Sequence, residues 1–152
     1  MSPFILSFLI GVIAGLRTLT ALAAVSWAAR LGWLHLGGTW LAFLGSAAAP
    51  YIISLAAVAE LVNDKLPRTP SRKAPAPFIA RILSGALCGA AFGAVSQALV
   101  GGLVAGALGA VAGTLGGYEL RTRLARATGG HDLAIALLED GIAIGGAIWI
   151  VS

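Results

Sequence analysis

The chain has 152 residues, of which 59% are hydrophobic and 11% charged, and its mean hydropathy is +0.94. Soluble domains carry about 25% charged residues, so this composition argues against a water-soluble fold and indicates helices that face lipid. The formal net charge is +4. Most basic residues stand at the ends of apolar runs, which is typical of membrane anchoring and argues against nucleic-acid binding. We therefore expect an all-α membrane protein.

The first apolar run covers residues 4–34 and is interrupted by arginine. A spanning helix needs roughly 20 mostly apolar residues. The run therefore predicts either one long tilted helix or a helix broken near Gly11, Gly15 and Arg17. The next apolar piece, 39–49, is too short to span, and we expect it to be interfacial or re-entrant.

Further apolar runs bring the prediction to about five transmembrane helices in a single domain. Residues 67–77 hold four prolines, which exclude helix, so this segment is predicted as a cytoplasmic loop. The remaining predicted spans are 50–66, 78–100, 103–124 and 133–151.

Basic residues gather at two connections of this five-span arrangement, which both fall on one side of the membrane. By the positive-inside rule that side is the cytoplasm. We therefore expect a multi-pass protein of the bacterial inner membrane with its N-terminus inside and its C-terminus outside. The residues are Lys65, Arg68, Arg72, Lys73 and Arg81 around the loop, and Arg121, Arg123 and Arg126 before the last span.

Glycines recur at four-residue spacing on the third and fourth predicted spans, as in a glycine zipper. Such spacing forms a smooth face that lets two helix backbones approach closely. Two interpretations stay open: the two spans pack on each other within the chain, or the faces join copies in a homo-oligomer. The glycines are Gly85, Gly89 and Gly93 on one span and Gly109, Gly113 and Gly117 on the other.

Two short stretches of the first half resemble stretches of the second half in the same order. Residues 11–15 resemble 109–113, and residues 61–66 resemble 137–142. If these pairs are related, the chain is a 2+1+2 inverted-topology repeat with the third span as connector. Such repeats are typical of transporters and place the binding site near the middle of the membrane.

Ionisable residues inside a membrane cost roughly 2.5–3.5 kcal/mol each on insertion scales. They are kept when they are paired, hydrated or functional. The sequence places five such residues within or at the ends of apolar spans: Arg17, Glu60, Asp64, Glu139 and Asp140. Polar residues of secondary interest near them are Thr18, Thr20, Asn63 and Glu119.

These residues have two interpretations. They can line a polar path for an ion or small solute, which predicts a transporter or channel. Alternatively, Arg17 pairs with Glu139 or Asp140 only to lock two helices together, which suits a structural or accessory membrane subunit or a lipid-binding protein. A lipid-modifying enzyme that uses the two acids as acid-base groups is a third hypothesis. No catalytic motif, cofactor-binding motif or metal-ligand spacing is present, so we expect no enzyme and no cofactor, and name no metal.

Three segments also resemble a family of small membrane proteins classed as a domain of unknown function, family 4126. They are residues 15–18, 60–67 and 136–144, and the block from Glu60 to Pro67 is the most specific. The resemblance covers most of the chain and implies a membrane protein without implying a mechanism. It singles out Arg17, Glu60, Asp64, Lys65 and Pro67.

Overall fold

The computed structural model describes residues 1–66 and 74–152, and all regular structure in these residues is helical. Pro67 and most of the predicted loop lie outside the described residues. The loop was predicted to reach residue 77, but a helix begins at Pro75 because proline is tolerated in the first turn. The elements are α1 (Pro3–Leu16), α2 (Thr18–Arg30), the short 3-10 helix η1 (Trp40–Gly45), α3 (Ala49–Asn63), α4 (Pro75–Val95), α5 (Leu99–Ala127) and α6 (Asp132–Val151).

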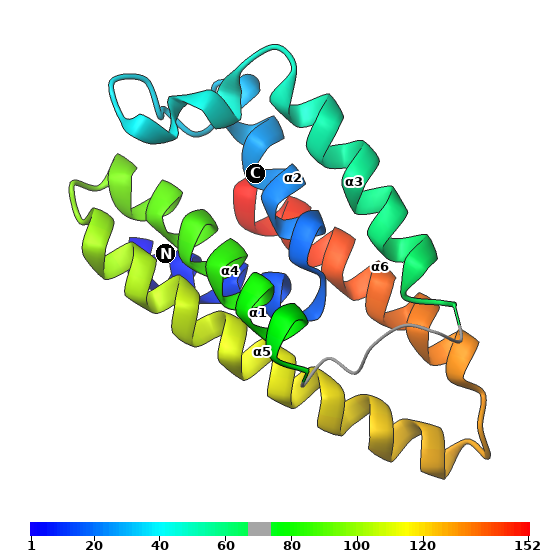
Figure 1. Cartoon of the computed structure of the whole chain (residues 1–152). Helices are drawn as coiled ribbons and strands as arrows, with labels where there is room; N and C mark the ends of the chain where they lie inside the picture. Colours follow the sequence, from blue (N-terminus) through cyan, green and yellow to red (C-terminus); the bar gives the residue numbers. More distant parts are fainter. Residues whose placement is uncertain (67–73) are drawn as a thin grey trace.

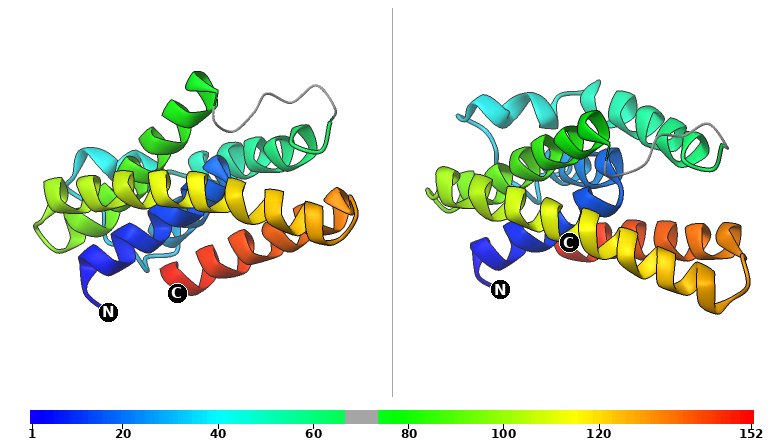
Figure 2. Two further views of the ribbon diagram at one scale, coloured as in Figure 1. Left: turned by 90° about the horizontal axis from the view of Figure 1, so that it is seen from below. Right: turned by 60° about the horizontal axis from the view of Figure 1, so that its bottom comes forward.

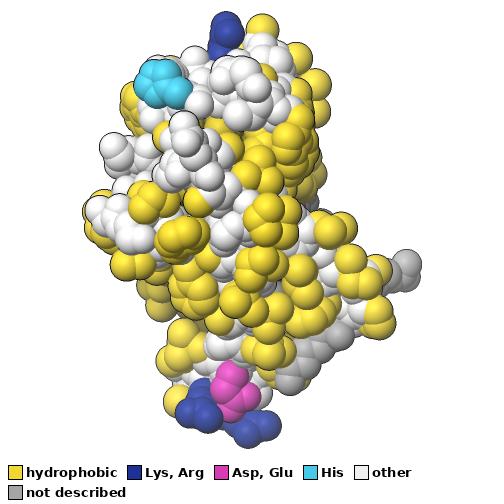
Figure 3. Space-filling view, turned by 90° about the vertical axis from the view of Figure 1, so that its left-hand side faces the viewer, with side chains coloured by type: hydrophobic (Ala, Val, Ile, Leu, Met, Phe, Trp, Pro, Cys, Tyr) yellow, Lys and Arg dark blue, Asp and Glu magenta, His cyan; other side chains and the backbone are white. Residues whose placement is uncertain are grey.

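Three of the described helices, α4, α5 and α6, are long and apolar enough to cross a membrane, and α1 and α3 are shorter apolar helices. The face drawn in Figure 3 carries hydrophobic side chains over its middle and charged or histidine side chains at its two ends. An apolar middle between polar ends matches a bilayer between two aqueous phases. The chain therefore has the character of an integral membrane protein.

The first predicted span is two helices, α1 and α2, that meet at Arg17. This residue has extended backbone angles (φ −140°, ψ 107°), which end α1 and start α2. Helix α1 runs beside α5 in the same direction, because Phe4 faces Gly101 and Gly15 faces Ala110. This break corresponds to the second interpretation of residues 4–34, a helix broken near Gly11, Gly15 and Arg17, and not to one long tilted helix.

Helix α2 turns back from this break toward the end of the bundle where α1 began. It runs antiparallel to α3, since Thr18 contacts Glu60 and Trp27 contacts Ser54. Its far end leads to η1, which packs against α2 and α3 at this end of the bundle (Figure 1). Helices α1 and α2 therefore form a hairpin with Arg17 buried at its tip.

The hairpin changes the predicted topology. Both views in Figure 2 place the two termini close together at one end of the molecule, whereas five spans would place them at opposite ends. The prediction differs because it counted residues 4–34 as one crossing, and the run returns at Arg17 instead. The parallel course of α1 and α5 also gives the inverted repeat no support, because that repeat needs these two segments to run in opposite directions.

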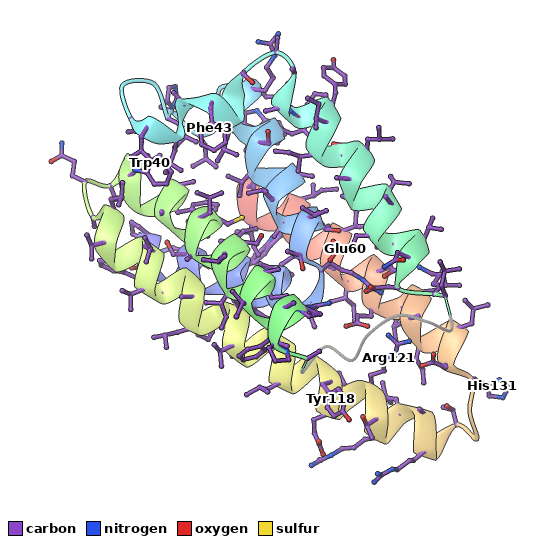
Figure 4. The ribbon with its side chains drawn as sticks, viewed as in Figure 1. Trp40, Phe43, Glu60, Tyr118, Arg121 and His131 are labelled. Carbon is purple, nitrogen blue, oxygen red and sulfur yellow. The ribbon has the colours of Figure 1, made fainter. Side chains whose placement is uncertain are left out.

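The predicted short piece at 39–49 contains η1 at the end of the bundle. Leu41 and Leu44 are fully buried, while Trp40 and Phe43 are 61% and 51% exposed. Figure 4 shows the two aromatic residues on η1, at this end of the bundle. Aromatic side chains in this position are typical of the membrane–water interface.

Glycines allow the closest helix contacts of the fold. Gly85, Gly89 and Gly93 of α4 face the first half of α5, and a Cβ atom at any of them would overlap atoms of α5 or of Ala98, which precedes it. Gly109 and Gly113 of α5 instead face the backbone of α1. Gly85, Gly89, Gly93, Gly109 and Gly113 are thus covered within the chain, whereas Gly117 lines a groove between α5 and α6.

Candidate functional site

Arg17 is the centre of a cluster of charged side chains, and its own side chain is 0% exposed. Its Nη1 donates a hydrogen bond to Oδ2 of Asp64, at the end of α3. Its Nη2 lies 2.5 Å from Oδ1 of Asp140 and 3.9 Å from Oε2 of Glu139, both on α6. A guanidinium stays charged in proteins, so these carboxylates balance it in the interior.

Further basic residues balance the same acids from the outer side. Lys65 lies 2.6 Å from Oδ2 of Asp140 and also donates to the carbonyl of Leu61 at 3.0 Å. Arg121 of α5 lies 3.8 Å from Oε2 of Glu139 and donates two hydrogen bonds, of 3.0 and 2.8 Å, to Asp132. The acids of α6 are thus shared between the buried arginine and the basic end of the bundle.

The break at Arg17 leaves helix ends inside the protein, and charged side chains cap both. Nη1 of Arg81, on α4, donates to the carbonyl oxygens of Gly15 at 2.5 Å and Leu16 at 2.8 Å, at the end of α1. Glu60 accepts hydrogen bonds from the first two N–H groups of α2 and points from α3 into the bundle (Figure 4). Each charge has the sign that its helix dipole favours.

Not every buried donor in this centre is used. Among the described residues, Nε of Arg17 and Oγ1 of Thr20 are buried and have no hydrogen-bond partner. The close contact from Nη2 of Arg17 to Asp140 is an ion pair that lacks hydrogen-bond geometry. Because buried polar groups in native proteins are nearly always paired, unused donors mark a place where a ligand or water can bind.

A groove lies beside the centre, between the second half of α5 and the first half of α6. It has an empty volume of ≈ 440 Å³, and it is mostly apolar. The groove reaches the centre at Leu16 and Glu139. Its lining residues are Leu16, Gly117, Leu120, Arg121, Leu124, Ile135, Leu138, Glu139 and Ile142.

The structure brings together all five residues of the predicted path: Arg17, Glu60, Asp64, Glu139 and Asp140. Thr18 joins them through its backbone, and Thr20 through its position in the same turn of α2. Asn63 ends α3 and is exposed. Glu119 is separate, because it pairs with Arg123 at 2.8 Å on the exposed end of α5.

Sequence reasoning missed the role of Arg81 and the pairing of Lys65. Both were counted among the basic residues that flank the loop. Arg81 lies six residues inside α4 and is only 4% exposed. Its place within an apolar helix was the signal, because an arginine that deep needs a partner. The partners, two backbone carbonyls of another helix, are visible only in the fold.

Comparisons with known proteins identify the family without adding a mechanism. The family model described as "Domain of unknown function (DUF4126)" matches residues 4–152. The comparison with curated proteins and the comparison with solved structures each give no significant match. The match covers every described residue of the charged centre and of the groove. This all-helical chain therefore belongs to the DUF4126 family of unknown function.

Proposed function

We propose that this protein is a membrane transporter or channel that moves an ion or small solute through a polar path around Arg17. The proposal depends on one feature, a helix hairpin whose buried tip carries a charged side chain held by acids from two other helices. Broken helices inside a membrane are tolerated where they line a cavity or bind a substrate. A purely structural contact does not need two helix ends and a guanidinium at this place.

The depth of the tip supports the same function. Helix α1 has 14 residues, which at 1.5 Å per residue span about 21 Å of a hydrocarbon core of about 30 Å. Arg17 is then well inside the membrane, reached from the end that carries both termini. Between a solute bound there and the far side lie, among the described residues, the charged end of α3 and the charged first half of α6.

The basic residues suggest the orientation of this path. Lys65 follows the end of α3, and Arg121, Arg123 and Arg126 lie in the last turns of α5. These helix ends are opposite to the termini, so that end is proposed to face the cytoplasm. Both termini then lie outside the cytoplasm. A bacterial inner membrane is the proposed location.

Solute flux into proteoliposomes tests this function. Purified protein is reconstituted and assayed with a panel of ions and small solutes at several pH values. We expect flux of at least one solute in wild type and its loss in Asp64→Asn and Glu139→Gln. Glu119→Gln is the matched control, because Glu119 pairs at the surface away from the centre. Equal flux in all four proteins under every condition would contradict the proposal.

The groove between α5 and α6 favours a second candidate, a lipid-binding protein. Its apolar lining suits an acyl chain, and Arg121 lies at its edge. Leu138→Trp should fill the groove and reduce co-purified lipid measured by native mass spectrometry. Leu137→Trp is the control, because Leu137 is 55% exposed and does not line the groove. Equal lipid in both variants would reject this candidate.

A homo-oligomer remains part of the proposal, but its contacts would use other surfaces than the glycine faces. The outward face of α3 is the suitable one, because Tyr51, Ile52 and Leu55 are 64%, 65% and 74% exposed. A structural or accessory subunit is the remaining alternative. Pull-down in mild detergent would then recover a different protein in fixed ratio, which the transporter does not require.

A further inference from the structure

The carboxylate of Glu60 occupies the N-terminus of α2, and helix N-termini are positions at which anions bind. Its Oε1 accepts the N–H of Thr18 at 2.9 Å, and its Oε2 accepts the N–H of Leu19 at 2.8 Å. These are the first two N–H groups of α2, where free donors and the helix dipole favour an anion. Glu60 comes from another helix, α3, and is only partly buried. A carboxylate supplied in this way can leave the site without unfolding α2.

The site offers more donors than Glu60 uses. Arg17 is the residue that caps α2, and its Nε is buried without a hydrogen-bond partner among the described residues. The hydroxyl of Thr20 is also buried and has no hydrogen-bond partner among these residues. Thr20 is the third residue of α2 and is 8% exposed. Helical side chains lean toward the N-terminus, so its hydroxyl is directed back to the cap. Together these groups can hold oxygens that a single carboxylate leaves unbound.

The negative charge of Glu60 lies at the start of α2, next to the buried guanidinium of Arg17. A further net charge in this interior would be strongly unfavourable. An anion can therefore take the place of the Glu60 carboxylate only if that carboxylate is neutralised at the same time. The other charged groups of the centre among the described residues are Lys65, Arg81, Arg121, Asp64, Asp132, Glu139 and Asp140.

Resting on the transport function proposed above, we propose that the solute is a small monovalent oxyanion and that it enters with one proton. The proton adds to the Glu60 carboxylate, which then releases the N–H groups of Thr18 and Leu19. Two oxygens of the anion take its place, with Arg17 and Thr20 as additional donors. Release on the other side reverses both steps, so one anion and one proton cross together and no net charge moves.

The remaining contacts between α2 and α3 let Glu60 withdraw. At the opposite end of this pair, the rings of Trp27 and Tyr51 are in edge contact with centroids 5.1 Å apart, and Trp27 donates to Ser54 at 2.9 Å. This end keeps the helices together while the Glu60 end is exchanged. An anion about the size of a carboxylate needs no larger opening, because it takes the place of the Glu60 carboxylate.

Titration calorimetry of the purified full chain in detergent tests the coupling on wild type alone. Formate, acetate and nitrate are the probes, each in two buffers of different ionisation enthalpy. We expect uptake of one proton per bound anion, and therefore an affinity that falls about tenfold for each rise of one pH unit. Binding without proton uptake would overturn the inference, and so would failure of all three anions to bind.

Glu60→Gln separates the carboxylate from the rest of the site. Glutamine keeps the shape and removes the negative charge, so the anion should bind without a proton, and its affinity should lose the roughly tenfold change per pH unit expected for wild type. Glu119→Gln makes the same change in charge outside the centre and should behave as wild type. Proton-dependent binding that persists in Glu60→Gln would overturn the inference.

Flux measurements distinguish this inference from the function on which it rests. In proteoliposomes, wild-type flux of the anion should be unaffected by a clamped voltage, and Glu60→Gln flux should become voltage-dependent. Flux of a cation or neutral solute alone would overturn the inference and leave the transport function standing. Proton-coupled binding without any flux would overturn the transport function and leave the anion site standing.

Discussion

The α4–α5 contact and the Arg17 centre lie next to each other on the same bundle, yet different forces hold them. Gly85, Gly89 and Gly93 let α4 approach α5 until backbone meets backbone, and no charge takes part. Around Arg17, long charged side chains bridge helices that stay farther apart. In lipid, apolar side chains gain nothing by leaving the solvent, so helices associate either by close packing or by polar contacts. In this protein, close packing joins α4 to α5, and polar contacts join the helices around Arg17.

The two regions also differ in what a change of state would cost. A packed glycine contact has no alternative partners, so it can only be kept or lost. The charged centre holds several acids within reach of Arg17 and Lys65, and pairs can be exchanged. A transport path requires a rigid part of the bundle beside a part whose ion pairs can be exchanged. The following predictions test this contrast, from the largest expected effect to the smallest.

Arg17→Met should have the largest effect. Among the described residues, it leaves Asp64 without its cation and Asp140 with Lys65 alone, and breaking a buried ion pair costs about 3–5 kcal/mol. Thermal unfolding in detergent measures the loss. Adding Asp64→Asn and Asp140→Asn to the same variant should recover part of it. An unchanged midpoint for Arg17→Met alone would show that the centre contributes little stability.

Gly106→Val should have the next largest effect. A Cβ atom there would overlap the backbone of Gly85 and Gly89, and overpacking of this kind costs about 1–3 kcal/mol. The same unfolding assay applies, with Gly116→Val as control, because a Cβ at Gly116 meets nothing within 4 Å. If both variants unfold alike, the α4–α5 contact is looser than described.

Ser84→Ala tests the border between the two regions. The Ser84 hydroxyl donates to the carbonyl of Thr18 at 2.7 Å and so ties α4 to the start of α2. Losing one such hydrogen bond should lower the free energy of unfolding by about 1 kcal/mol. Ser96→Ala is the control, because Ser96 bonds only within its own helix end. A loss as large as that of Arg17→Met would place Ser84 inside the charged centre.

Arg123→Ala should have the smallest effect. Arg123 and Glu119 form an exposed pair one helical turn apart, with side chains 74% and 55% exposed. Surface pairs of this kind contribute less than about 0.5 kcal/mol. The unfolding midpoint should stay within error of wild type at low and high salt. A clear loss would mean that this end of α5 contacts something in the membrane.

The sequence was informative about the centre for a specific reason. Arg17, Glu139 and Asp140 stand in apolar surroundings, where a charge needs a partner, so their pairing could be anticipated without a fold. Arg81 obeys the same rule but was counted among the charges that flank the loop, because it comes soon after the prolines of residues 67–77. Glu60 was named as a path residue, but its bonds to Thr18 and Leu19 depend on the hairpin.

By itself, the sequence determined that the chain is helical, belongs in a membrane and holds its few charges together, because hydropathy and the cost of buried charge act on each residue locally. Only the tertiary structure decided that residues 4–34 turn back at Arg17, that both termini share one end, and that most of the spaced glycines are covered within the chain. Direction and pairing depend on which helices meet, and a hydropathy pattern does not contain that information.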